Sequence, residues 1–114
     1  LTWYRAAAEQ GYEKAQNKLG AMYSSGDGVP ENYAEALTWY RAAAEQGNAR
    51  AQYSLGLMYD SGNGVPENDS VAVKWYRLAA EQGHANARYR LKFMDDYGFG
   101  VSESDAEVVK SGIQ

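Results

Sequence analysis

The chain has 114 residues, a formal net charge of −4 and no cysteine. An acidic chain without a basic stretch lacks the electrostatic footprint that nucleic-acid binding requires, and no apolar run approaches the roughly 20 residues of a transmembrane helix. The lack of cysteine excludes a disulfide framework and cysteine-type zinc sites. The sequence therefore predicts a protein that binds neither nucleic acid nor metal and has no membrane span in this segment.

The dipeptide Trp-Tyr occurs three times, at Trp3, Trp39 and Trp75, with a constant spacing of 36 residues. The surrounding residues keep the same spacing, and 23 of 36 positions are identical between segments 15–50 and 51–86. A fixed period of this length is typical of one supersecondary unit copied in tandem. We therefore expect a single repeat domain, 1–114, built as a solenoid in which each unit contacts only its neighbours.

The chain begins within a unit. Residues 1–11 contain only the second half of the repeat, so we expect the chain to be a fragment of a longer protein. Residues 12–47 and 48–83 form two complete repeats, and residues 84–114 form a degenerate C-terminal repeat.

Each complete repeat is expected to contain two helices joined by a glycine-rich loop. Ala15, Leu19 and Met22 lie on one face of the first helix. After the loop, Asn32 is a good N-cap for the second helix, and Glu35 three residues later imitates a capping box. The pattern predicts that first and second helices alternate along the whole chain.

Glycines mark two further features. Gly47 and Gly83 follow the second helices at the position of a left-handed C-cap. Gly20 and Gly56 lie in the middle of first helices, where glycine costs roughly 1 kcal/mol relative to alanine, so their recurrence predicts a close approach between the two helices of a unit. No segment shows a strand pattern. The predicted fold is all-α, a solenoid of antiparallel helix hairpins with a 36-residue period.

Residues 84–114 depart from the repeat pattern. Ser111 and Gly112 stand where the pattern expects Trp-Tyr. Terminal repeats are atypical because one of their faces meets water. We therefore expect 99–114 to form a capping or frayed end, with a seventh helix that is cut short near Lys110.

The motif A-x-x-x-L-G-x-M-Y-x-S-G-x-G-V-P-E-N, followed by A-x-x-W-Y-R-x-A-A-E-Q-G-x-A, resembles the Sel-one-like repeat (SLR) family. This family belongs to the tetratricopeptide-like (TPR-like) α-solenoids, and the resemblance extends from Leu1 to about Val109. It implies a right-handed superhelix that acts as a scaffold or adaptor for other proteins.

The residue types that catalysis needs do not converge in this sequence. His84 is the single histidine and stands at a variable junction between helices, so we expect a solvated surface residue. A nucleophile–base pair or a metal site requires several converging partners. The Gly-x-Gly loops follow a helix rather than a strand, which favours a hairpin turn over a phosphate-binding loop. We therefore predict no enzyme activity and no cofactor.

Positions that vary between the repeats point to a binding surface. On the first helix of each unit they lie away from the apolar stripe, and the resemblance implies that this helix lines the concave side of the solenoid. The predicted partner-binding residues are Lys14, Asn17, Arg50, Tyr53, Leu57, Tyr89, Arg90 and Phe93. This groove becomes more aromatic along the chain, and aromatic residues beside arginine are typical anchors of interfaces. The sequence leaves open the alternative that Tyr53 and Tyr89 belong to the core.

The main functional hypothesis is a non-catalytic scaffold or adaptor that binds a peptide or protein segment in this groove. The alternative is a structural spacer within a larger protein whose activity lies in flanking domains. An enzyme would need catalytic groups from outside this segment. Exposed ends of the solenoid can also pair with each other, so self-association is a further expectation.

Overall fold

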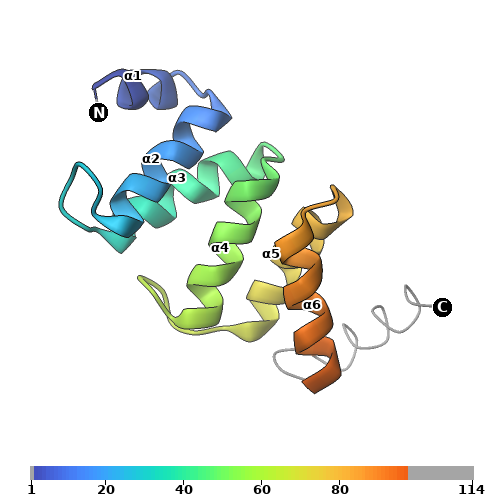
Figure 1. The fold of residues 1–114 in the computed structure, drawn as a ribbon. Coiled ribbons are helices and arrows are strands. Elements are labelled where there is room, and N and C mark those ends of the chain that lie inside the picture. Colours follow the sequence, from blue (N-terminus) through green and yellow to red (C-terminus); the bar gives the residue numbers. More distant parts are fainter. Residues whose placement is uncertain (1, 98–114) are drawn as a thin grey trace.

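A computed structural model describes residues 2–97 of the chain. Its helices are, in chain order, α1 (Thr2–Glu9), α2 (Glu13–Ser25), α3 (Tyr33–Glu45), α4 (Ala49–Ser61), α5 (Asp69–Glu81) and α6 (Ala85–Tyr97) (Figure 1). No strand occurs between residues 2 and 97. The predicted seventh helix, which would end near Lys110, lies outside the described residues.

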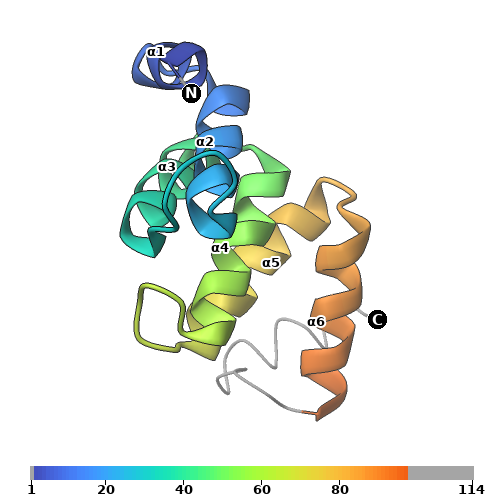
Figure 2. The same ribbon diagram turned by 60° about the vertical axis from the view of Figure 1, so that its left-hand side comes forward.

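The helices stack in the order in which they occur in the chain. Each helix packs on the helix before it and on the helix after it, and α1 and α6 lie at opposite ends of the stack (Figure 2). Helices α2, α4 and α6 are referred to below as the A helices, and α1, α3 and α5 as the B helices. The fold is an all-α solenoid with the 36-residue period of the sequence, as predicted.

The N-termini of the B helices confirm the predicted caps but not the capping box. Asn32 Oδ1 accepts a hydrogen bond from the N–H of Glu35 at 3.1 Å, and Asn68 caps α5 in the same way. A full box would need the Glu35 carboxylate to accept from the N–H of Asn32. That N–H donates instead to the Tyr23 carbonyl, and Glu35 Oε2 accepts from Trp39 Nε1 at 3.2 Å. The predicted capping box is therefore absent, since the N–H of Asn32 already has an acceptor and the Glu35 carboxylate is bonded to the indole of Trp39.

The C-termini of α3 and α5 end as predicted. Gly47 and Gly83 have φ angles of 95° and 90°, in the left-handed region. The N–H of Gly47 bonds to the Ala44 carbonyl at 3.0 Å, and the next N–H reaches the Ala43 carbonyl at 3.1 Å. These two bonds form a Schellman motif, which satisfies carbonyls that the end of the helix leaves unpaired.

The mid-helix glycines allow a tyrosine ring to lie directly on the A helix. A Cβ atom on Gly20 would lie 2.7 Å from Cδ1 of Tyr40, and one on Gly56 would lie 2.6 Å from Cε1 of Tyr76. Both distances are shorter than side-chain contacts permit, so no larger residue fits without displacing the ring. The predicted close approach within each unit is confirmed.

The core runs continuously through the stack. One cluster of buried side chains contains Tyr40 and Leu55, and a second contains Val73 and Tyr76. Alanines fill most of the other buried positions, which allows the helices to pack closely. Tyr59 packs against both clusters, so each repeat is stabilised by its neighbour, as expected for a solenoid.

Buried glutamines connect successive layers of the stack, a role that the repeat pattern did not predict. Gln16 is buried, its Nε2 donates to the Ala8 carbonyl at 3.1 Å, and its Oε1 accepts from Gln46 at 2.8 Å. Gln52 is also buried and repeats both bonds one unit later. Because a buried amide without partners is costly, this chain of hydrogen bonds favours one register between repeats.

Candidate interaction surface on the A helices

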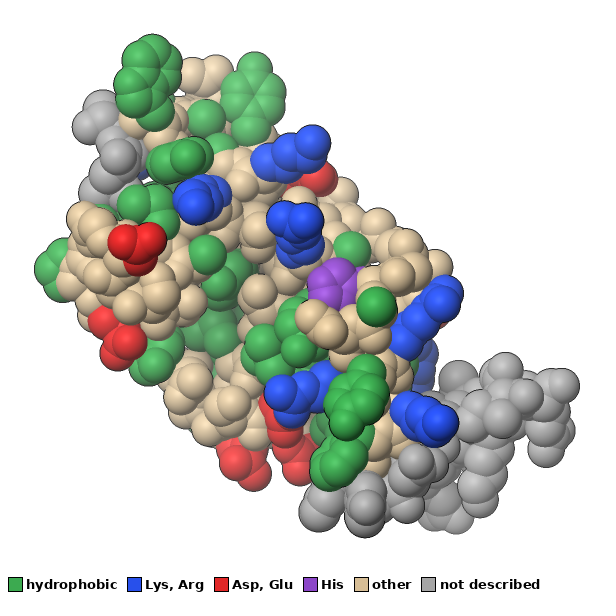
Figure 3. All heavy atoms as spheres, viewed as in Figure 1, with side chains coloured by type: hydrophobic (Ala, Val, Ile, Leu, Met, Phe, Trp, Pro, Cys, Tyr) green, Lys and Arg blue, Asp and Glu red, His purple; other side chains and the backbone are tan. Residues whose placement is uncertain are grey.

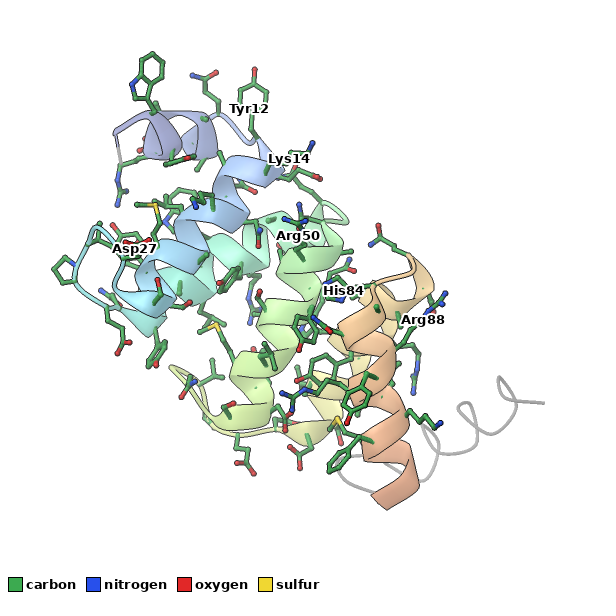
Figure 4. All side chains as sticks on the ribbon, in the orientation of Figure 1. Tyr12, Lys14, Asp27, Arg50, His84 and Arg88 are labelled. Carbon is green, nitrogen blue, oxygen red and sulfur yellow. The ribbon has the colours of Figure 1, made fainter. Side chains whose placement is uncertain are left out.

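All eight predicted partner-binding residues lie on the A helices. Figure 4 shows Lys14, Arg50 and His84 following one another along the molecule, from α2, from α4 and from the turn before α6. Basic side chains are spread over the same face in the space-filling view (Figure 3). Seven of these eight residues fall into two groups, one in each gap between successive A helices.

The first gap lies between α2 and the start of α4. It contains a hollow of about 730 Å³, whose lining includes Lys14, Asn17, Lys18 and Arg50. Glu13 also lines this hollow, and its carboxylate accepts a hydrogen bond from Asn48 Nδ2 at 3.3 Å. The structure therefore brings together the predicted residues Lys14, Asn17 and Arg50.

The second gap lies between α4 and α6. Its hollow has a volume of about 400 Å³ and is lined by Tyr53, Asn86, Tyr89, Arg90 and Phe93. The side chain of Tyr89 is 71% exposed and that of Phe93 is 45% exposed. Four predicted residues thus meet here, and two of them present aromatic rings to solvent.

Leu57 is separate from both groups. It is partly buried against the second core cluster and lines a third hollow of about 270 Å³ with Ser24, Tyr33 and Ser61. The helix-face pattern placed it in one continuous groove with the other seven residues. In the structure, this leucine is instead part of the packing between repeats.

Tyr53 belongs both to the core and to the surface. Its ring centroid lies 5.7 Å from that of Tyr76 and 4.7 Å from that of His84, with the imidazole stacked at 29°. It packs against the second core cluster and also lines the second hollow. Tyr89, in contrast, is a surface residue with most of its side chain exposed.

His84 is not the solvated residue that the sequence predicted. Its Nδ1 accepts a hydrogen bond from the N–H of Ala87 at 3.2 Å, so His84 caps α6 as Asn48 caps α4. A ring nitrogen that accepts must be unprotonated, which requires neutral imidazole. Burial, followed by the nearby charge of Arg50, lowers the pKa of His84 and favours that form.

A small polar network holds Arg90 at the edge of the second hollow. Tyr76 Oη donates to Asp60 Oδ2 at 3.1 Å, and Arg90 Nη1 lies 3.8 Å from the same oxygen. Burial and the Asp60 charge raise the pKa of Tyr76, so the phenol remains a donor. The pKa of Arg90 is raised first by a hydrogen bond with Tyr53. The guanidinium thus lies close to Asp60 and Tyr53.

Among the described side chains, no group of three or more His, Cys, Asp or Glu residues is placed to hold a metal ion. None of the helices within residues 2–97 has the length and apolar character needed to cross a bilayer. The surface offers a ligand amide groups from Asn17 and Asn86, positive charge from Arg50 and Arg90, and exposed aromatic area.

Two solved structures are similar to this chain. One is the crystal structure of c5321, a protective antigen present in uropathogenic Escherichia coli strains and displaying an SLR fold. The TM-score is 0.86 and the sequence identity 46%, and the match covers 89% of this chain and 22% of that chain. The other is a Sel1 repeat protein from Oxalobacter formigenes, with a TM-score of 0.78 and 47% identity, over 80% of this chain and 37% of that one. This chain therefore spans less than half the length of either protein. No curated protein matches it.

The family model of the Sel1 repeat matches residues 1–12, 13–48 and 49–84. Each matched segment contains one of the Trp-Tyr dipeptides. Sel1 repeats generally act as scaffolds for protein–protein interaction and are generally non-catalytic. The repeat sequence, the helix hairpins and these matches agree, and the chain belongs to the Sel1 repeat family.

Proposed function

We propose that this chain is a non-catalytic interaction module whose A helices hold a peptide or protein segment. Membership of a family of interaction scaffolds supports the proposal. So does the position of two neighbouring hollows on one face, because together they are lined by seven of the eight predicted residues. The bound segment would lie across the A helices and contact both gaps.

The exposure of Tyr89 and Phe93 carries the proposal. They are four residues apart on α6, so they lie on the same side of the helix. Both line the second hollow, next to Arg90, which is paired with Asp60. Aromatic rings and arginine are the groups that contribute most of the energy in protein interfaces.

Selection of random dodecapeptides displayed on phage tests the proposal. Peptides recovered on the native chain are expected to lose affinity for the double variant Tyr89→Ala/Phe93→Ala. Loss of an interface anchor costs about 2 kcal/mol or more, which corresponds to about 30-fold weaker binding. The melting temperature should hardly change, since both side chains are substantially exposed.

The chain offers a matched control for this experiment. Tyr12 and Leu78 are 62% and 43% exposed, and neither lines the first or the second hollow. The variant Tyr12→Ala/Leu78→Ala removes similar exposed apolar area and should keep full affinity. An equal loss of peptide affinity in both double variants would show that the recovered peptides bind exposed apolar groups in general and do not depend on the second gap. Failure to recover any peptide would favour the spacer alternative.

A further inference from the structure

The A helices are the basic part of this acidic chain. The A helices carry six basic residues, Lys14, Lys18, Arg50, Arg88, Arg90 and Lys92, and four acidic residues, Glu13, Asp60, Asp95 and Asp96. Their net charge is therefore +2, while the rest of the chain has −6, which together give the total of −4. The A helices thus hold six of the eleven basic residues of the chain and four of its fifteen acidic residues, a bias that calls for a specific explanation.

The cations of the first gap form no ion pair with a described carboxylate. The ion pair found among the described side chains joins Arg90 to Asp60, in the second gap. No described carboxylate forms an ion pair with Lys14, Lys18 or Arg50. Glu13 also lines the hollow and accepts from Asn48 without losing its charge, so the charged side chains of this gap sum to +2. Lys18 Nζ lies 6.0 Å above the ring of Tyr4, which leaves its charge uncompensated. Three cations thus surround one hollow of about 730 Å³.

The same hollow contains an acceptor that lacks a donor. Asn17 lines it, and the Oδ1 atom of this residue is buried without a hydrogen-bond partner among residues 2–97. A buried acceptor in this state is unfavourable by about 1–3 kcal/mol. Rotation of the amide about χ2 would present it to a main-chain N–H of a peptide lying in the hollow, which would remove that cost.

We propose that the segment bound by the A helices is acidic, with carboxylates over Lys14, Lys18 and Arg50 and an apolar or aromatic side chain packed on Tyr89 and Phe93. This inference rests on the proposed function and specifies the class of partner. A short acidic peptide interacts with the local charge, because the Debye length is only about 8 Å at physiological ionic strength. A long polyanion such as nucleic acid would also meet the negative remainder of the chain, which favours the peptide.

The test compares two charge reversals on the intact chain. Arg50 and Lys74 are both exposed helical residues, but only Arg50 lines the first hollow. The probe is the strongest dodecapeptide from the random selection, together with a twin in which each Asp and Glu is replaced by Asn and Gln. Selected peptides should be enriched in Asp or Glu and contain an aromatic or large aliphatic residue.

We expect Arg50→Glu to weaken binding of the acidic peptide about tenfold, because attraction at the rim of the interface becomes repulsion. Lys74→Glu changes the net charge equally and should leave the affinity unchanged. The neutral twin should bind the native chain more weakly and lose its dependence on Arg50. Added salt should weaken the acidic peptide more than the twin. Glutamate near the start of α4 is compatible with the helix dipole, so the variant should fold.

The outcomes separate this inference from the proposed function. Peptides that require Tyr89 and Phe93 but show no acidic enrichment and ignore Arg50→Glu would retain the function and overturn the acidic partner. No selected peptide at all would overturn both. A single-stranded oligonucleotide that binds in an Arg50-dependent way would assign the cations to nucleic acid instead. Dimerisation of the chain that Arg50→Glu abolishes in light scattering would assign the hollow to a second copy. Either result would overturn the inference.

Discussion

The two gaps between successive A helices share a backbone and differ in chemistry. Asn17 and Asn48 in the first gap occupy the repeat positions of Tyr53 and His84 in the second. The first gap is lined by amides, one carboxylate and three cations without an ion-pair partner, whereas the second is lined by aromatic rings and an arginine paired with a carboxylate. The capping and close-contact positions are the same in both units. The positions that recur in every repeat therefore determine the shared helix caps and close contacts, which are called the frame below. The variable positions determine what each gap can bind.

The largest expected effect concerns the shared frame. Gly56→Ala would place Cβ against the ring of Tyr76, and Gly20→Ala would place it against Tyr40. We expect each change to lower the free energy of unfolding by about 1–3 kcal/mol, because overpacking outweighs the gain in helix propensity. The loss should be greater at Gly56, since Tyr76 is 0% exposed and Tyr40 is 5% exposed. Urea unfolding followed by far-UV circular dichroism measures both.

A double variant shows whether the ring is the cause of this loss. Gly56→Ala/Tyr76→Leu removes the ring that the new methyl group would contact. The two changes should therefore destabilise the chain by less than the sum of the single variants. If the losses in free energy of unfolding simply add, the contact between the new methyl group and the ring is not the cause of the loss, and the close approach does not explain the glycine.

The second prediction exchanges the residues that distinguish the gaps. Tyr53→Asn removes a ring that packs on Tyr76 and stacks on His84, and we expect a loss of about 2 kcal/mol for a partly buried aromatic. The reverse change, Asn17→Tyr, removes a side chain whose buried oxygen has no hydrogen-bond partner, and position 17 lies beside an open hollow. It should alter stability by less than about 1 kcal/mol. Similar losses in both variants would contradict the asymmetry between the gaps.

Much of the frame could be predicted because it depends on residues close in sequence or repeated at a fixed interval. Asn32, Gly47 and Gly20 have local or periodic signals, and all three have the predicted roles. The glutamine bonds were missed even though Gln16 recurs as Gln52, because a repeated polar residue does not reveal whether its side chain is buried. The recurrence of this glutamine is visible in the sequence, but only the packing of adjacent layers shows that its side chain is buried and bonded between them.

The candidate binding surface was predicted less completely than the frame. Seven of the eight residues chosen by their angular position on the helix line the two hollows. Angular position ignores position along the helix axis, and Leu57 was therefore grouped with residues from which it is separate. His84 was misjudged because an imidazole that caps a helix has no sequence signature beyond its alignment with Asn48. The Tyr76–Asp60 hydrogen bond lies within one repeat and has a counterpart between Tyr40 and Ser24 at 3.3 Å. The ion pair of Asp60 with Arg90, in contrast, joins two variable positions in successive repeats, which the periodic pattern does not indicate.

The third prediction concerns pH and affects only the second gap. The pKa of His84 is lowered in the folded chain, whereas in the unfolded chain it is about 6.5. The folded chain thus binds fewer protons than the unfolded chain in this range. The stabilisation from the cap is complete above the unfolded pKa and is lost as pH falls through the folded pKa. We expect this loss to be bounded by the contribution of an N-cap, about 1 kcal/mol.

His84→Asn isolates this contribution. Asparagine at the same position caps α4 through Asn48 and does not titrate, so the variant should keep the cap and lose this part of the pH dependence. Unfolding by urea at pH values on both sides of the histidine transition makes the comparison. If the native chain and the variant lose stability in parallel as pH falls, carboxylates elsewhere govern the acid response and His84 does not.

The smallest expected effect tests whether the two gaps are independent. Arg50 lines the first hollow, yet its charge contributes to the lowered pKa of His84 beside the second. Arg50→Gln should therefore raise the pKa of His84, but only partly, because burial is the larger cause. His84 is the single histidine of the chain, so its Cε1 proton resonance gives an unambiguous NMR titration, with Lys74→Gln as the control.

An unchanged titration of His84 in Arg50→Gln would mean that the two gaps are electrostatically separate. A shift would mean that an acidic peptide over Arg50 also raises the pKa of His84, so that one resonance reports occupation of the first gap from within the second.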